Sequence, residues 1–258
     1  MERISILGGR DKAGRREDLD LTLRRGDILS IVGPTGAGKS RFLEDLSCLA
    51  QGDTPTGRRV LIDGKPPADE LRYALEGRLV AQLSQNMNFI MDLTVEEFIR
   101  MHGECRRPAQ PDRMVERIIA AANRLTGEAI GAETPVTQLS GGQSRALMIA
   151  DTGLLSPSPV VLIDELENAG VDRSRALELL VGEDKIVLVS THDPVLALLG
   201  SRRLCFRGGA VWRVIETSPA EQRNAARMAA VNERFLELRD LLRNGATLEA
   251  EPFGDCCV

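Results

Sequence analysis

The chain has 258 residues, of which 43% are hydrophobic and 28% charged, and a formal net charge of −5. These values fit a soluble globular protein with one large or two ordinary domains, and the acidic balance does not favour nucleic-acid binding. No apolar run approaches the roughly 18 to 20 residues of a membrane span, and no N-terminal export signal is present, so we expect a cytoplasmic protein without its own membrane span.

The first 64 residues are expected to form strands around one helix. Apolar and polar residues alternate at Ile4 and Ile6 and over residues 19–23, as in half-buried strands. Residues 28–32 predict a buried strand that runs into Gly33, and residues 60–64 predict a strand and turn. A helix is expected to begin near Lys39, because apolar residues follow at helical spacing, namely Phe42, Leu43, Leu46 and Leu49.

Downstream, the pattern changes from strand to helix and back. Residues 79–83 predict a strand, and residues 95–150 predict helices with a loop over 106–111. Strands are expected at 160–163, 186–190 and 204–206, with a hairpin turn at Gly208 and Gly209. After Pro219 the spacing predicts a long amphipathic helix that ends at Gly245. Strands that alternate with helices in this way predict an α/β core.

The first chemical motif lies between the buried strand and the helix that follows it. Its glycines allow backbone N–H groups to surround phosphate oxygens at a helix N-terminus. Lys39 would reach the β and γ phosphates, and the Ser40 hydroxyl would bind Mg²⁺. The motif fits G-x-x-x-x-G-K-S without a gap, over Gly33, Pro34, Thr35, Gly36, Ala37, Gly38, Lys39 and Ser40. It predicts a nucleoside triphosphate and Mg²⁺ as ligands.

Three further motifs follow in order along the chain. Residues 139–143 read LSGGQ, residues 160–163 run into Asp164 and Glu165, and the apolar run 187–189 leads through Ser190 and Thr191 to His192. Alone, each has an ordinary interpretation as a turn before a helix, a polar strand end or a surface histidine. In this order, from about residue 4 to about 214, they resemble the ATP-binding cassette (ABC) ATPases.

The resemblance implies a P-loop NTPase fold of ABC type, with a mixed sheet core, a helical signature subdomain and a C-terminal amphipathic helix. Asp164 matches the aspartate that holds Mg²⁺, Glu165 the general base and His192 the histidine that contacts the γ-phosphate. Gln85 matches the Q-loop glutamine, a ligand of Mg²⁺, with Gln82 as the second candidate. Ser140, Gly141, Gly142 and Gln143 match the signature motif. Because side chains alternate along a strand, Asp164 is expected to face the metal and Glu165 the attacking water.

The sequence departs from the family pattern at two places. Leu166 and Glu167 replace the usual Pro-Thr or similar pair, so that Asp172, the closing residue of the D-loop, arrives one position late. The aromatic residue that often stacks on adenine is missing, and Arg10 stands near its place. Its guanidinium could stack on a base or could belong to a solvated loop, so the base preference stays open.

The resemblance also implies a partner, because the signature of one cassette caps the γ-phosphate bound to another. One phosphate loop and one signature therefore predict a homodimer or a cassette heterodimer. We expect an ATPase domain over residues 1–217 and a helical extension over 218–258, which covers the core or contacts a partner. The expected function is to drive a separate permease at the inner face of the membrane. The alternative is a soluble ABC ATPase that remodels or activates a protein or metalloenzyme.

Overall fold

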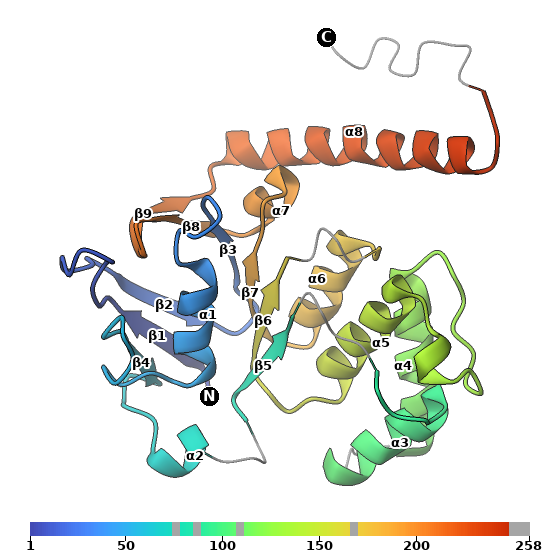
Figure 1. The fold of residues 1–258 in the computed structure, drawn as a ribbon, viewed down its shortest axis with the longest axis horizontal. Coiled ribbons are helices and arrows are strands. Elements are labelled where there is room, and N and C mark those ends of the chain that lie inside the picture. Colours follow the sequence, from blue (N-terminus) through green and yellow to red (C-terminus); the bar gives the residue numbers. More distant parts are fainter. Residues whose placement is uncertain (74–77, 85–88, 107–110, 166–169, 248–258) are drawn as a thin grey trace.

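The computed structural model of the chain describes residues 1–73, 78–84, 89–106, 111–165 and 170–247, and a mostly parallel sheet forms its centre (Figure 1). Within these residues the sheet has six strands in the order β5-β6-β7-β3-β8-β9. The strands from β5 to β8 are parallel, and β9 is antiparallel to β8. They are β5 (Val80–Leu83), β6 (Val160–Asp164), β7 (Ile186–Ser190), β3 (Ile28–Val32), β8 (Arg202–Arg207) and β9 (Ala210–Glu216). The predicted α/β core is confirmed.

A second, antiparallel sheet lies beside the first and has the order β2-β1-β4 in the described residues. Its strands are β1 (Arg3–Leu7), β2 (Asp20–Arg24) and β4 (Arg59–Ile62). Helix α1 (Lys39–Ser47) contacts β4 as well as β5 and β6 of the larger sheet. One apolar core therefore joins both sheets to α1, and it includes Ile4, Ile6, Leu21, Leu23, Ile31, Phe42, Leu46, Leu162 and Phe206.

Four helices form a second core against β6 and β7. They are α3 (Val95–Arg106), α4 (Pro111–Leu125), α5 (Gly141–Leu154) and α6 (Arg173–Gly182). Val161 and Ile163 of β6 belong to this helical core, whereas Val160 and Leu162 belong to the core around α1. The strand is buried on both faces, which explains why its sequence is continuously apolar. The break predicted between the first two helices lies between α3 and α4, and residues 107–110 are outside the described residues.

Several short elements were not predicted from the sequence. These are α2 (Asp69–Tyr73), the 3₁₀ turn η1 (Val136–Gln138) and α7 (Pro194–Leu199). Helix α7 starts directly after the motif that ends at His192, where the Asp193 carboxylate accepts hydrogen bonds from the N–H groups of Val195 and Leu196. Its six residues are too few for a helical period to be recognised.

The predicted C-terminal helix is α8 (Pro219–Arg243), which extends over α7 (Figure 1). Ala225 and Leu238 are buried, but Phe235, Leu241 and Leu242 are 56%, 46% and 54% exposed. The helix therefore covers the body with only part of its apolar surface. Among the described residues, no helix combines the length and the hydropathy that a membrane span requires.

Parallel pairing brings three chain segments to one edge of the larger sheet. Strand β7 lies between β6 and β3, and the register pairs Asp164 and Ile31 with Ser190. The carboxyl ends of these strands therefore lie side by side. The phosphate loop, Glu165 and the segment from Thr191 to His192 follow those ends directly.

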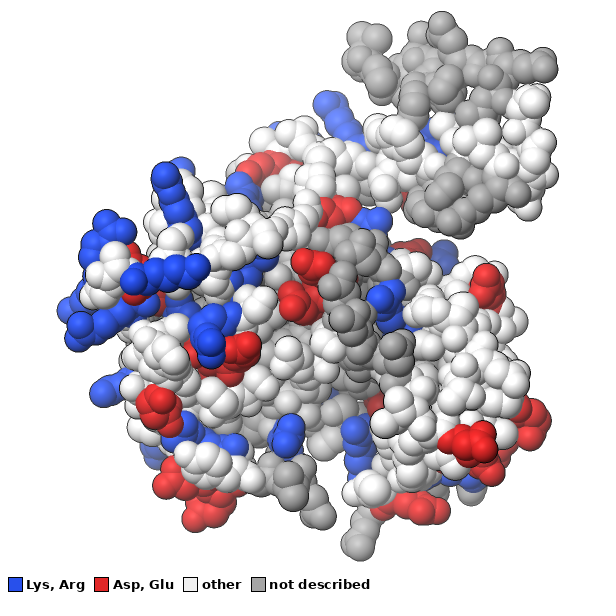
Figure 2. Space-filling model, viewed as in Figure 1, with Lys and Arg blue, Asp and Glu red and all other residues white. Residues whose placement is uncertain are grey.

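Basic side chains gather at the upper left of the face in Figure 2, where Figure 1 shows the loop after β1 and the β8–β9 hairpin. The loop contributes Arg10, Lys12, Arg15 and Arg16, all of which are exposed. Although the whole chain is acidic, this region is locally cationic and favours the approach of an anion.

Candidate functional site

The phosphate loop packs closely against strand β8 and the β8–β9 turn. Gly33 and Gly38 have φ angles of 151° and 110°, and both occupy positions where a side chain would collide with the backbone. A Cβ atom on Gly33 would lie 2.7 Å from the Phe206 carbonyl oxygen, and one on Gly38 would lie 2.9 Å from the Gly209 Cα. Gly38 is the N-cap of α1, so the loop ends at a helix N-terminus that favours an anion.

Lys39 directs its ammonium group into the loop. Its Nζ donates to the Gly33 carbonyl at 2.7 Å and lies 3.2 Å from His192 Nε2. Because an ammonium group can only donate, Nε2 is the acceptor in this contact. The phosphate loop and the histidine are thus in direct contact.

Glu165 lies just beyond the end of β6. Its φ angle is +56°, and its N–H donates to the Ser190 carbonyl at 3.0 Å. The Glu165 carboxylate comes within 3.9 Å of His192 Nε2. The expected alternation of Asp164 and Glu165 along a strand is wrong, because β6 ends at Asp164 and the backbone then turns into the left-handed region. Both carboxylates consequently line the same pocket.

This pocket has a volume of about 280 Å³ and is lined by the phosphate loop, by Asp164 and Glu165 at the end of β6, and by His192. Ser40 and Asp164 supply hydroxyl and carboxylate oxygens, the hard donors that Mg²⁺ prefers. Among the described residues, no group of three or more His, Cys, Asp or Glu is placed to hold a metal ion. Gln85 lies outside the described residues. The lining residues are Lys12, Thr35, Gly36, Ala37, Gly38, Lys39, Ser40, Arg41, Asp164, Glu165 and His192.

Like Arg41, Lys12 lines the pocket although the sequence did not predict it. It belongs to no motif, and the only signal was its rarity, since the chain has just four lysines. Arg10, the predicted base-stacking residue, is exposed and does not line the pocket; its N–H donates to the Thr56 carbonyl at 2.7 Å.

The predicted signature residues do not line the phosphate-loop pocket of their own chain. Ser140 is the N-cap of α5 and forms a capping box with Gln143, whose N–H donates to Ser140 Oγ and whose side chain accepts from the Ser140 N–H. Gly141 is exposed and Gly142 is half-buried. The N-terminus of α5 is therefore capped by its own side chains and lies outside the pocket that Lys39 lines.

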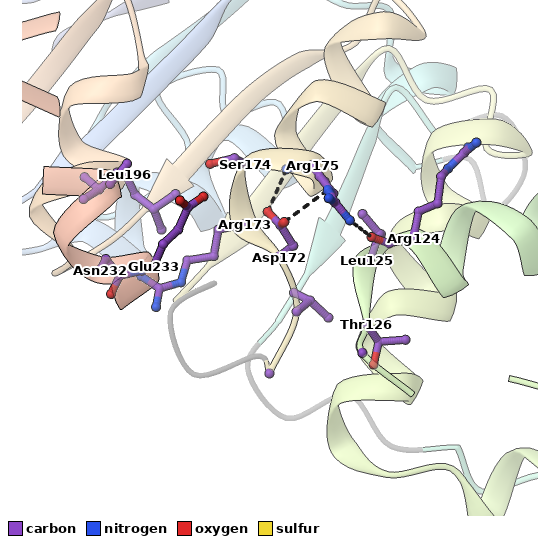
Figure 3. A pocket seen from close by; sticks show the side chains of 15 residues that line it. Arg124, Leu125, Thr126, Asp172, Arg173, Ser174, Arg175, Leu196, Asn232 and Glu233 are labelled. Carbon is purple, nitrogen blue, oxygen red and sulfur yellow. Dashed lines mark hydrogen bonds and ion pairs between the residues drawn. The ribbon is translucent and has the colours of Figure 1, made fainter. Parts of the chain in front are cut away.

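Asp172 lines a second pocket of about 390 Å³, shown in Figure 3. It is the N-cap of α6, and its carboxylate accepts from the Arg175 N–H at 3.1 Å. A Cβ on Gly170 would lie 3.4 Å from the Gly142 Cα, so the segment before α6 lies against the start of α5. Residues 166–169 are outside the described residues, so the first part of the predicted D-loop is not placed.

Comparisons with known proteins identify the family. The ABC transporter family model matches residues 16–168, more than half of the chain. The uncharacterised ABC transporter ATP-binding protein MJ0121 of Methanocaldococcus jannaschii is 49% identical over 252 residues, 97% of this chain and 96% of that protein. The chain belongs to the ABC transporter family.

Two further proteins are similar to this ABC cassette. The cobalamin import ATP-binding protein BtuD of Halobacterium salinarum is 31% identical over 72% of the chain, which spans about half (47%) of BtuD. The dimeric post-hydrolysis structure of the cassette MJ0796, bound to ADP and Pi, has a TM-score of 0.61 at 25% identity and covers 83% of this chain and 99% of that one. The fold is that of a P-loop ABC ATPase.

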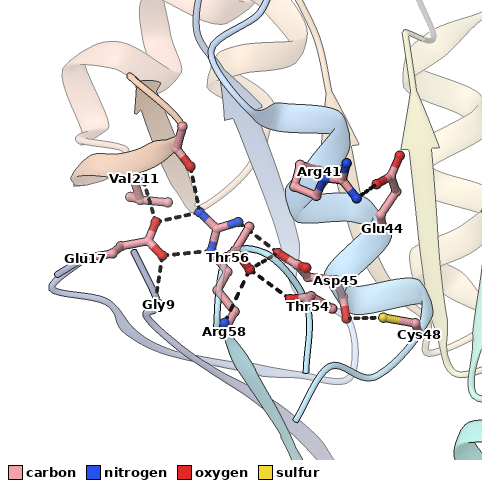
Figure 4. A network of polar contacts seen from close by, with 11 residues as sticks. Gly9, Glu17, Arg41, Glu44, Asp45, Cys48, Thr54, Thr56, Arg58 and Val211 are labelled. Carbon is pink, nitrogen blue, oxygen red and sulfur yellow. Dashed lines mark hydrogen bonds and ion pairs between the residues drawn. The ribbon is translucent and has the colours of Figure 1, made fainter. Parts of the chain in front are cut away.

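A buried ion-pair network joins α1, the helix after the phosphate loop, to the loop after β1 (Figure 4). Arg58 is fully buried and bonds both oxygens of Glu17, at 2.7 and 2.9 Å, and Asp45 of α1 at 2.9 Å. Burial alone would lower the pKa of Arg58, but the contacts with Glu17 and Asp45 outweigh it and raise that pKa. Glu17 also accepts from the N–H groups of Gly9 and Val211. One cation thus joins the first loop, α1 and the β8–β9 hairpin.

Replacing Gly38 tests the contact between the phosphate loop and the β8–β9 turn. Gly38→Ala is expected to lower the free energy of unfolding by about 1–3 kcal/mol more than Gly36→Ala, measured by urea denaturation. Both positions have positive φ, but a Cβ on Gly36 would meet no atom within 4 Å. Equal losses in the two variants would show that the turn does not constrain the loop.

Replacing Arg58 tests the buried network. Arg58→Met is expected to lower the free energy of unfolding by about 3–5 kcal/mol, because it leaves the Glu17 and Asp45 carboxylates buried without their cation. The matched control is Arg59→Met, at the exposed neighbouring position, with an expected change of about 0.5 kcal/mol or less. Similar urea midpoints for the two variants would contradict the role given to Arg58.

Proposed function

We propose that the chain is the ATP-hydrolysing subunit of a transporter, that two cassettes pair head to tail, and that they drive a separate membrane permease. The observation that carries this proposal is that Lys39, Glu165 and His192 face one pocket together with the phosphate loop. The similarity to BtuD, a cobalamin import ATP-binding protein, supports a role in transport.

In the proposed reaction the phosphate loop and Lys39 bind the triphosphate, with the backbone N–H groups at the start of α1 directed to its oxygens. Ser40 and Asp164 are the residues that would hold Mg²⁺, which would neutralise charge on the phosphate oxygens. These groups orient the γ-phosphoryl group for displacement, since hydrolysis of this kind depends mainly on position and charge.

Glu165 is the proposed general base. A water oxygen bonds to the γ-phosphorus while the bond to the bridging β–γ oxygen breaks, and Glu165 takes the water proton, which gives ADP and phosphate. His192 Nε2 lies 3.2 Å from Lys39 Nζ and 3.9 Å from the Glu165 carboxylate. Once Lys39 donates to phosphate oxygens instead, a proton on Nε2 would let His192 donate to the γ-phosphate or to Glu165. The role of Gln85 stays a prediction.

The position of the signature supports pairing with a second cassette. Ser140, Gly141 and Gly142 lie at an outward-facing helix N-terminus, which would bind an anion supplied by another chain. Asp172, in the segment against Gly142, would lie at the same contact. The related cassette MJ0796 forms a dimer, in agreement with this arrangement.

In this proposal residues 1–217 form the ATPase domain, into which the helical part, about 95–150, is inserted, and 218–258 are an extension. The cassette would work on the cytoplasmic side, held at the inner face of the membrane by the permease. The alternative, a soluble ATPase that remodels a client protein, predicts the same chemistry and a different partner.

Glu165→Gln tests the proposed chemistry. We expect the rate of phosphate release to fall by at least about 100-fold, because a general base is lost, while ATP binding persists and a dimer accumulates with ATP and Mg²⁺. Phosphate release and size-exclusion chromatography measure these effects. Glu178→Gln, at an exposed position on α6, is the control and should hydrolyse ATP at the unmutated rate. Unmutated activity in Glu165→Gln would overturn the assignment of the base.

The partner is tested by affinity capture with the Glu165→Gln protein, ATP and Mg²⁺, from detergent-solubilised membranes and from cytosol in parallel. We expect a protein with several membrane spans. The matched bait carries Lys39→Ala in addition and should lose the partner, because capture depends on bound nucleotide. Recovery of a soluble partner alone, with the membrane sample empty, would replace the transporter proposal by the remodelling one.

A further inference from the structure

Lys12 lies against the phosphate loop although it is distant from it in sequence. Its Nζ donates to the Gly36 carbonyl at 2.9 Å, and its backbone N–H donates to the Gly208 carbonyl at 3.0 Å. The next residue of that turn, Gly209, donates to the Ala37 carbonyl at 2.9 Å. The β8–β9 turn therefore contacts Lys12 on one side and the phosphate loop on the other, and holds the two together.

The loop that carries Lys12 is organised by its own hydrogen bonds. The Asp11 carboxylate accepts from the N–H groups of Ala13 and Arg15, both at 2.8 Å, and pairs with the Arg15 guanidinium. The hydrogen bond from the Arg15 N–H is the main reason why the pKa of Asp11 is lowered. Asp11 is thus engaged by Arg15, and no carboxylate in the described part of the chain forms an ion pair with Lys12.

Lys39 and Lys12 reach the loop at two different positions. Lys39 donates to the carbonyl of Gly33 and Lys12 to that of Gly36, so the loop has an ammonium group near its start and another near its middle. A phosphate oxygen is a stronger acceptor for an ammonium group than a neutral carbonyl oxygen. Both lysines line the pocket, so an anion bound there would compete with these carbonyl oxygens for the two ammonium groups.

We propose that Lys12 is a second phosphate-binding lysine, and that this cassette recognises nucleoside triphosphates chiefly through the phosphate chain. The inference rests on the proposed function, because it requires a nucleotide in the phosphate-loop pocket. The substrate class is then nucleoside triphosphates irrespective of their base, because the phosphate chain that Lys12 would contact is common to all of them. Arg10, Arg15 and Arg16 raise the local positive potential but do not line the pocket.

The test measures dissociation constants by isothermal titration calorimetry in the presence of Mg²⁺. The ligands are the non-hydrolysable β,γ-imido analogues of ATP and GTP, and inorganic tripolyphosphate. Lys12→Ala is expected to raise the dissociation constant of each of the three ligands about tenfold. This is the lower end of what the loss of a charge-assisted hydrogen bond costs, because Lys12 is exposed. Lys12→Arg should restore most of the affinity, and Lys12→Ala should show a weaker dependence on salt than the unmutated protein.

The control is Lys65→Ala, which removes the same charge from an exposed turn outside the pocket and should leave all three affinities unchanged. Equal affinities of Lys12→Ala and the unmutated protein would overturn the proposal. So would a loss confined to the ATP analogue, since Lys12 would then contact the base. If the unmutated protein bound none of the three ligands, the proposed function itself would fail, which separates the two hypotheses.

Discussion

The parallel register of β6, β7 and β3 is the constraint on which the site depends. Asp164 and Ile31 are both level with Ser190, so three loops from distant parts of the sequence begin at the same height on adjacent strands. The register is held by strands that are buried on both faces, where a shift by one residue would exchange their side chains between the two cores. The distance of 3.2 Å between Lys39 and His192 is a consequence of this packing.

The backbone conformation of Glu165 determines how its side chain is placed at the sheet edge that the strand register forms. Glu165 adopts a left-handed backbone conformation that non-glycine residues seldom adopt, and the bond from its N–H to Ser190 helps to hold it there. This turn allows two consecutive carboxylates to face one pocket, where we propose that one holds a metal ion and the other activates water. The buried strands β6 and β7 hold the backbone in this unfavourable conformation.

The sequence predicted features that depend on local pattern, and it missed those that depend on distant contacts. The phosphate loop and the strand before Asp164 are recognisable because composition and spacing determine them. The sequence predicted that Glu165 follows a buried strand, but no sequence pattern indicated its left-handed backbone conformation. From the sequence alone Arg58 would be taken for a surface residue, because its buried partners Glu17 and Asp45 are distant from it in the chain. Lys12 could not be found because the β8–β9 turn, far along the chain, brings it to the pocket.

The surface proposed to meet a second cassette is connected to the chemistry within one chain. Arg173, which follows Asp172, forms an ion pair with Asp193, the neighbour of His192. Asp193 also caps α7, so two independent contacts hold the residue after the histidine. Gly170, on the other side of Asp172, lies against Gly142 at the start of α5. The start of α5, the segment before α6 and the histidine loop are therefore connected by contacts within one chain.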